Sequence, residues 1–155
     1  YFWYLMRDNQ YLKSQFERLF GSPDIDYDLA LESYYKDGAN TAWRERYITP
    51  YASSHPFEDW AETWSHYLHL IDGLETAANL GFTEEVALNQ PLGHKLKVWE
   101  EISSRLDELN RSLGVTDHYH FSVNELVAEK LGFIKIFIQE LQTNGLMQEA
   151  GQRPF

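Results

Sequence analysis

Hydrophobic residues recur at helical intervals along most of the chain, most clearly over residues 56–79. Their three- and four-residue steps are typical of a helix with one core-facing stripe. Pro56 suits a first helical turn, Ser54 or His55 suits the N-cap, and Gly81 suits the end of the helix. The pattern predicts a long central helix whose stripe comprises Phe57, Trp60, Ala61, Trp64, Tyr67, Leu68, Ile71, Leu74 and Ala78.

The same reasoning predicts four further helices, over residues 1–20, 27–36, 95–113 and 123–143. Asp24 or Asp26 can cap the second of these helices. Ser122, with Glu125 three residues later, is typical of a capping box at the start of the last one.

Strand patterns are nearly absent, with residues 46–49 the one candidate. We therefore expect an all-α domain, with about five helices packed as an irregular bundle over residues 1–145. A frayed tail is expected over residues 146–155.

A second stripe on the central helix carries ionisable groups, because Glu58, Glu62, His66 and His69 follow one another at steps of four, four and three. Such a stripe is usually a solvated acidic face. The alternative is that its carboxylates face a metal ion. Asp59 lies about 100° round the helix from Glu58 and is interpreted as an acid that complements the helix dipole.

Composition narrows the classes of function. The chain has 155 residues, a net charge of −11 and no cysteine. The acidic balance argues against nucleic acid and against anionic membranes as partners. The lack of cysteine excludes thiolate zinc sites and a cysteine nucleophile, and it is compatible with the reducing cytoplasm, which is the expected location. No apolar stretch has the length of a membrane helix.

A family resemblance is carried by residues 55–69, which read His-Pro-Phe-Glu-Asp-Trp-Ala-Glu-Thr-Trp-Ser-His-Tyr-Leu-His. This segment resembles the bacterial zinc-binding metallopeptidases, a zincin-like family in which a glutamate is the third zinc ligand. The resemblance extends over nearly the whole chain, through residues 1–3, 16–21, 27–35, 109–114 and 130–133. The family's His-Glu-x-x-His motif is absent, and His66 and His69 do not replace it. The motif is expected immediately before Tyr1, so this chain is expected to be the C-terminal part of a catalytic domain.

The resemblance also implies roles for individual residues. Glu58 would be the third zinc ligand, and Glu62 would be an acid that orients this ligand. Tyr51 stands seven residues before Glu58, as a tyrosine does in similar toxin metalloproteases, and its phenol would donate to the oxyanion of the reaction. The alternative for Tyr51, one of ten tyrosines in the chain, is simple packing.

The resulting expectation is a zinc-dependent metallopeptidase that acts on a peptide or protein substrate. Its zinc needs ligands upstream of Tyr1, so this chain alone is expected to be inactive. The competing hypothesis is a non-catalytic, acidic, helical protein-interaction domain. A di-metal bundle is disfavoured because it needs paired Glu-x-x-His motifs, which the sequence lacks. The sequence upstream of Tyr1 would discriminate between the metallopeptidase and the interaction domain, because only the metallopeptidase needs a His-Glu-x-x-His motif there.

Overall fold

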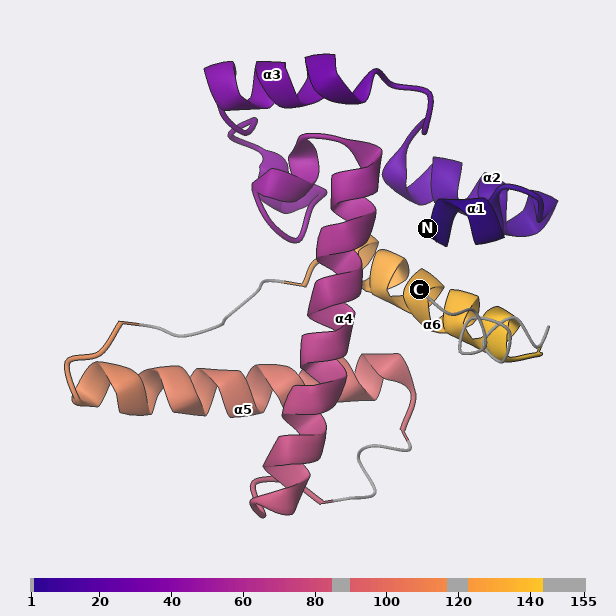
Figure 1. The fold of residues 1–155 in the computed structure, drawn as a ribbon. Coiled ribbons are helices and arrows are strands. Elements are labelled where there is room, and N and C mark those ends of the chain that lie inside the picture. Colours follow the sequence, from indigo (N-terminus) through magenta and orange to yellow (C-terminus); the bar gives the residue numbers. More distant parts are fainter. Residues whose placement is uncertain (1, 85–89, 117–122, 144–155) are drawn as a thin grey trace, which may run out of the picture.

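The computed structural model describes residues 2–84, 90–116 and 123–143, whose regular elements are helices joined by turns and irregular segments (Figure 1). No strand occurs among the described residues, so residues 46–49, the candidate strand, do not form one. The expected all-α class is confirmed. The α-helices are α1 (Phe2–Met6), α2 (Gln10–Phe20), α3 (Tyr27–Asp37), α4 (Pro56–Asn79), α5 (Leu92–Ser112) and α6 (Glu125–Thr143). Two short 3-10 helices, η1 (Trp43–Glu45) and η2 (Tyr51–Ser53), lie in the connection before α4.

The bounds of α4 match the prediction, and its cap is His55. The Nδ1 atom of His55 accepts the backbone N–H of Phe57 at 3.0 Å. The single helix expected over residues 1–20 is wrong, because Asn9 interrupts it. The Asn9 side chain accepts the N–H groups of Tyr11 and Leu12, both at 3.1 Å, and thereby starts a new helix. The described residues therefore form six α-helices where five were expected.

The last two helices also differ at their starts from the prediction. Helix α5 begins at Leu92, three residues earlier than expected. Helix α6 begins at Glu125, where the side chain of Asn124 accepts the N–H of Val127 at 2.8 Å. Ser122, the predicted cap, lies outside the described residues, and so does the predicted tail. Asn124 therefore provides the capping contact observed at α6.

Helix α4 is the axis around which the other helices pack (Figure 1). Helices α1, α2 and α6 form one hydrophobic cluster with its first half, which contains Phe16, Trp60 and Phe137. Helices α5 and α6 form a second cluster with its later half, which contains Leu70, Ile102 and Leu131. Helix α3 lies over the N-terminal end of α4 and has no buried residue of its own. No helix of the described residues is long and apolar enough to cross a membrane.

The buried face of α4 differs from the predicted stripe. Ala61 and Leu68 belong to that stripe but are exposed. Asp59, Thr63 and His66 are buried in their place. The reason is that α6 packs against the side of α4 that carries Asp59 and Leu70, and hydrophobic periodicity alone does not reveal the direction from which a neighbour approaches.

Helices α4 and α5 approach closely at Gly73. A Cβ atom at this position would lie 2.4 Å from Cζ3 of Trp99. We expect Gly73→Ala to lower the free energy of unfolding by about 1 kcal/mol, because overpacking costs about 1–3 kcal/mol and the gain in helix propensity returns only about 1 kcal/mol. Urea denaturation followed by circular dichroism measures the change. Gly93→Ala is the control, since nothing lies within 4 Å of its Cβ position; equal stabilisation by both substitutions would contradict the close approach.

Candidate functional site

Glu58 lies in the first turn of α4, where a tyrosine from α3 meets it. The hydroxyl of Tyr27 donates to Oε1 of Glu58 at 2.5 Å. This hydrogen bond is the main cause that raises the pKa of Tyr27 above its usual range, followed by partial burial. The phenol therefore remains a donor, and it holds the Glu58 carboxylate in one orientation.

The starts of α3 and α4 are joined through His55. Its Nδ1 accepts from Phe57, so the ring proton is on Nε2, which donates to the backbone oxygen of Ile25 at 3.0 Å. The ring of Tyr27 also packs edge-on against His55, with centroids 5.0 Å apart. These contacts explain how α3, although it buries no residue, delivers Tyr27 to Glu58.

Tyr51 belongs to η2, directly before α4, and the structure brings it into the same neighbourhood as Glu58. Its pKa is raised to about 12, first by partial burial, then by the charge of Glu58 and by a side-chain hydrogen bond with Tyr35. Its ring packs edge-on against Tyr34, with centroids 5.6 Å apart. Glu58 and Tyr51 were both singled out from the sequence, and the catalytic roles assigned to them remain predictions.

Sequence reasoning missed the contribution of α3 to this group. Tyr27, Tyr34 and Tyr35 are seven and eight residues apart, which places them on one side of a helix. That spacing was the available signal, but a tyrosine stripe is more often interpreted as packing. Together with Tyr51 and Glu58 these residues form what we call the tyrosine–glutamate cluster.

Glu62, one turn after Glu58, contacts the connection that carries Tyr51. Its Oε2 atom accepts the hydroxyl of Thr49 at 2.9 Å, while the same hydroxyl oxygen accepts the N–H of Ala52 at 3.1 Å. Glu62 therefore fixes the start of η2. Further along α4, His66 is buried and its Nδ1 lies 2.7 Å from the backbone oxygen of Glu62. Burial lowers the pKa of His66, so it is neutral at pH 7 and donates this hydrogen bond.

Asp59 lies in the first turn of α4, as expected for an acid at the helix start, but it is also fully buried and paired with a lysine, which the sequence did not predict. Lys130 of α6, itself 2% exposed, donates to Oδ2 of Asp59 and to the backbone oxygen of Arg46, both at 2.6 Å. The ammonium group also lies 4.7 Å from the ring centre of Tyr47. Burial raises the pKa of Asp59 to about 7 and lowers that of Lys130. A lysine within the apolar stripe of α6 was the available signal in the sequence.

The described residues do not provide a complete set of zinc ligands. Among the described residues, no group of three or more histidine, aspartate or glutamate side chains could hold a metal ion. Glu58 supplies one suitable carboxylate, which Tyr27 orients. Structural and catalytic zinc sites use three or four protein ligands. Glu58 alone provides fewer ligands than such a site needs.

Comparison with known proteins provides relatives but no structural match. The chain is 38% identical over 148 residues to uncharacterized proteins of Mycobacterium bovis and Mycobacterium tuberculosis, and the match covers 91% of this chain. It covers 43% of each relative, so the chain spans less than half of the length of these curated relatives. No solved structure matches it. The family model described as "Putative zinc-binding metallo-peptidase" matches residues 1–137, and the chain therefore belongs to this zinc-binding metallopeptidase family.

Proposed function

We propose that the protein containing this chain hydrolyses peptide bonds with the help of zinc, and that Glu58 is one of the zinc ligands. The observation that carries the proposal is the tyrosine–glutamate cluster. In a member of this family, it places an oriented carboxylate and a phenol donor together at the start of one helix. The substrate class that follows is a peptide or a protein.

Zinc, when bound, would supply the positive charge that polarises the peptide carbonyl and activates a water molecule. Two histidine ligands and a general base are proposed to come from a His-Glu-x-x-His segment outside this chain. Within the chain, Tyr27 orients Glu58, and Glu62 holds the segment that carries Tyr51 through Thr49. Because the pKa of Tyr51 is about 12, its phenol keeps its proton at pH 7 and can donate to an oxyanion.

A helical protein-interaction domain remains the second candidate, and one observation favours it. The C-terminal half of α5 and the residue that caps it expose leucines at helical spacing, with Leu106 42%, Leu109 57% and Leu113 70% exposed. An exposed apolar stripe of this kind is typical of a contact surface. The two candidates differ in one measurable property, because only the first requires hydrolysis of a peptide bond.

Zinc content of the full-length protein tests the roles of the two glutamates. We expect Glu58→Gln to remove zinc or greatly weaken its binding, because an amide is a poor replacement for an anionic ligand. We expect Glu62→Gln to weaken zinc by about 10- to 100-fold, as changes in groups that support a metal site without touching the metal do. Metal analysis after dialysis against a graded zinc chelator measures both.

The matched control is Asp72→Asn, which removes an exposed acid from the same helix and should leave zinc binding unchanged. Equal losses for Glu58→Gln and Glu62→Gln would contradict the assignment of Glu58 as the ligand and Glu62 as an acid that only supports the site. Full retention of zinc by Glu58→Gln, with the fold intact by circular dichroism, would refute the proposed metal site.

A further inference from the structure

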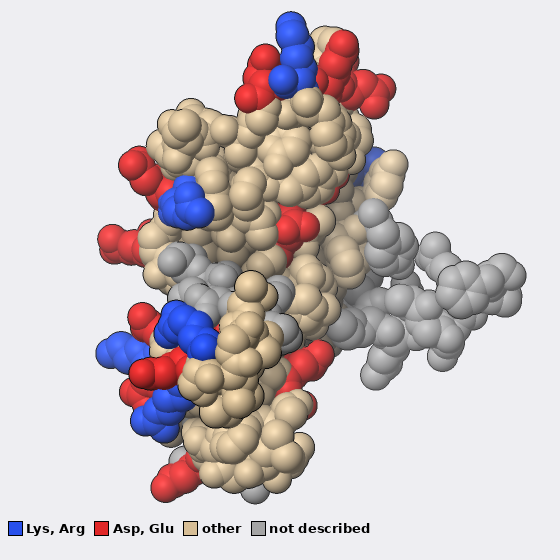
Figure 2. Space-filling view, turned by 90° about the vertical axis from the view of Figure 1, so that its left-hand side faces the viewer, with Lys and Arg blue, Asp and Glu red and all other residues tan. Residues whose placement is uncertain are grey.

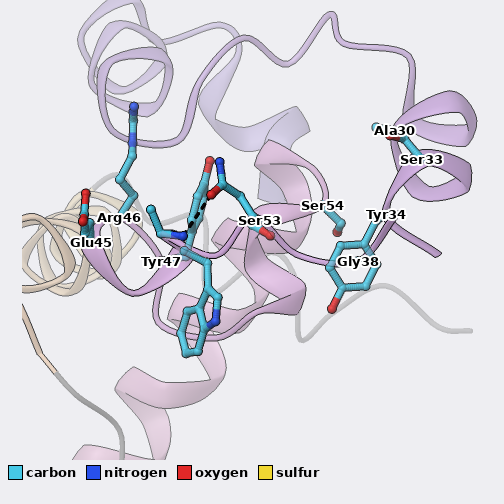
Figure 3. Close-up of a pocket in the computed structure, with 12 residues that line it drawn as sticks. Ala30, Ser33, Tyr34, Gly38, Glu45, Arg46, Tyr47, Ser53 and Ser54 are labelled. Atoms are coloured by element: carbon cyan, nitrogen blue, oxygen red, sulfur yellow. Dashed lines mark hydrogen bonds between the residues drawn. The ribbon is translucent and has the colours of Figure 1, made fainter. Parts of the chain in front are cut away.

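A cavity of about 450 Å³ lies beside the tyrosine–glutamate cluster (Figure 3). Its walls come from α3, from the connection with η1, and from η2. Tyr34 lines the cavity and also packs edge-on against Tyr51. Ser53 and Ser54, two and three residues after Tyr51, form another part of the wall. The cavity and the proposed catalytic phenol therefore share one boundary.

Three aromatic side chains line this cavity, with Tyr34 on the side of Ser54 and Tyr47 beside Arg46 on the other side (Figure 3). Tyr34, Trp43 and Tyr47 provide ring surfaces. Glu45 and Arg46 also line the cavity, but their charges are opposite, and in Figure 3 they lie on the side away from Tyr34 and Ser54. On the outer face in Figure 2, acidic and basic side chains are likewise interspersed and do not form one broad patch of either sign. These walls suit a flat, uncharged group of a ligand.

Ser54 supplies a second, independent indication of a ligand. Its side chain is 9% exposed, and its hydroxyl has no hydrogen-bond partner among the residues that the structure describes. A buried hydroxyl without a partner is uncommon in folded proteins and needs an explanation. Because Ser54 lines the cavity, a polar atom of a ligand that reaches this oxygen would satisfy it, since a serine hydroxyl both donates and accepts.

We propose that this cavity is a subsite for one uncharged aromatic side chain of the peptide substrate, with tyrosine preferred because its hydroxyl would pair with Ser54. This inference rests on the proposed peptidase function, because only that function makes the bound group part of a substrate. Binding itself needs neither zinc nor hydrolysis. The volume is within the range of ligand pockets, roughly 300–1,000 Å³, and exceeds what one aromatic ring occupies, so adjoining backbone atoms of the peptide would also fit.

Binding of small amino-acid amides to the full-length protein tests the subsite. The probes are N-acetyltyrosinamide, N-acetylphenylalaninamide and N-acetyllysinamide, with affinities measured by ligand-observed NMR titration. We expect the tyrosine amide to bind most tightly and the lysine amide most weakly. Ser33→Trp should obstruct the cavity and weaken the tyrosine amide at least tenfold, whereas Glu32→Trp, the adjacent exposed position outside the lining, should have no effect.

Ser54→Ala should reduce the preference for the tyrosine amide over the phenylalanine amide by about 2- to 10-fold, the value of one hydrogen bond. Circular dichroism confirms that the variants fold. Equal affinities for all three amides, or equal effects of Ser33→Trp and Glu32→Trp, would overturn the subsite.

The two proposals fail in distinguishable ways. If the amides bind as expected but the protein hydrolyses no peptide, the subsite stands and the peptidase function fails. If peptides are hydrolysed with a preference that Ser33→Trp leaves unchanged, the function stands and the subsite is refuted.

Discussion

Lys130→Met is expected to lower the free energy of unfolding by about 3–5 kcal/mol, because it leaves a buried carboxyl without its partner. Asp59 is 0% exposed, and the ammonium group of Lys130 is its cationic contact at 2.6 Å. Methionine retains an unbranched chain of similar length, so the loss reports chiefly on the missing ammonium group and its contacts with Asp59 and the Arg46 backbone. Urea denaturation at pH 7 and pH 5 measures the effect.

The pH dependence of this loss has a definite sign. Lys130 lowers the pKa of Asp59, so its removal leaves that pKa above the value of about 7. A carboxyl whose pKa in the folded state exceeds that in the unfolded state binds its proton more tightly when folded. Its contribution is fully present below the unfolded pKa of about 3.9 and is lost as the pH rises through the folded value. The variant should therefore lose less stability at pH 5 than at pH 7.

The matched control removes both charges. Asp59→Leu combined with Lys130→Met should recover much of the loss, because a buried pair replaced by apolar residues is often nearly neutral for stability. A single variant that loses less than about 1 kcal/mol, or a double variant no more stable than the single one, would contradict the role given to this pair.

Tyr51→Phe in the full-length protein is expected to lower turnover by about 100- to 1,000-fold while zinc content and fold remain unchanged. The reason is the loss of one hydrogen-bond donor to the oxyanion that forms as water attacks the carbonyl. The measurement is kcat on a cleaved peptide, with zinc determined on the same sample. Tyr11→Phe, an exposed tyrosine of α2, is the control and should keep full activity. If Tyr51→Phe lowers kcat by less than about threefold, the catalytic role is wrong and Tyr51 only packs.

The central helix was predictable from the sequence because its signals are local. Pro56, the cap at His55 and the apolar period specify its bounds without reference to the rest of the chain. The signal from Asn9 was equally local. Its side chain accepts two following N–H groups, and these hydrogen bonds outweighed an apolar pattern that continued past it. There the interruption of the helix depended on a single polar residue.

The candidate site was predictable only where its residues are close in sequence. Tyr51 and Glu58 adjoin because a short turn connects them to the same helix end. Tyr27 reaches Glu58 through the contact of His55 with Ile25, 30 residues apart, and no local pattern encodes it. The burial of Asp59 likewise depends on Lys130, 71 residues later. Such pairs are set by how helices dock.

The ammonium group of Lys130 also has a consequence for the order of events during synthesis. It joins the backbone of Arg46 to Asp59, so the connection that carries Tyr47 and Tyr51 is fastened by a helix that leaves the ribosome much later. Until Lys130 itself has been added and has emerged, this fastening is impossible. The contacts by which Lys130 fastens this connection are therefore made only after α6 has emerged, later than the contacts of Thr49 with Glu62 that hold the same segment.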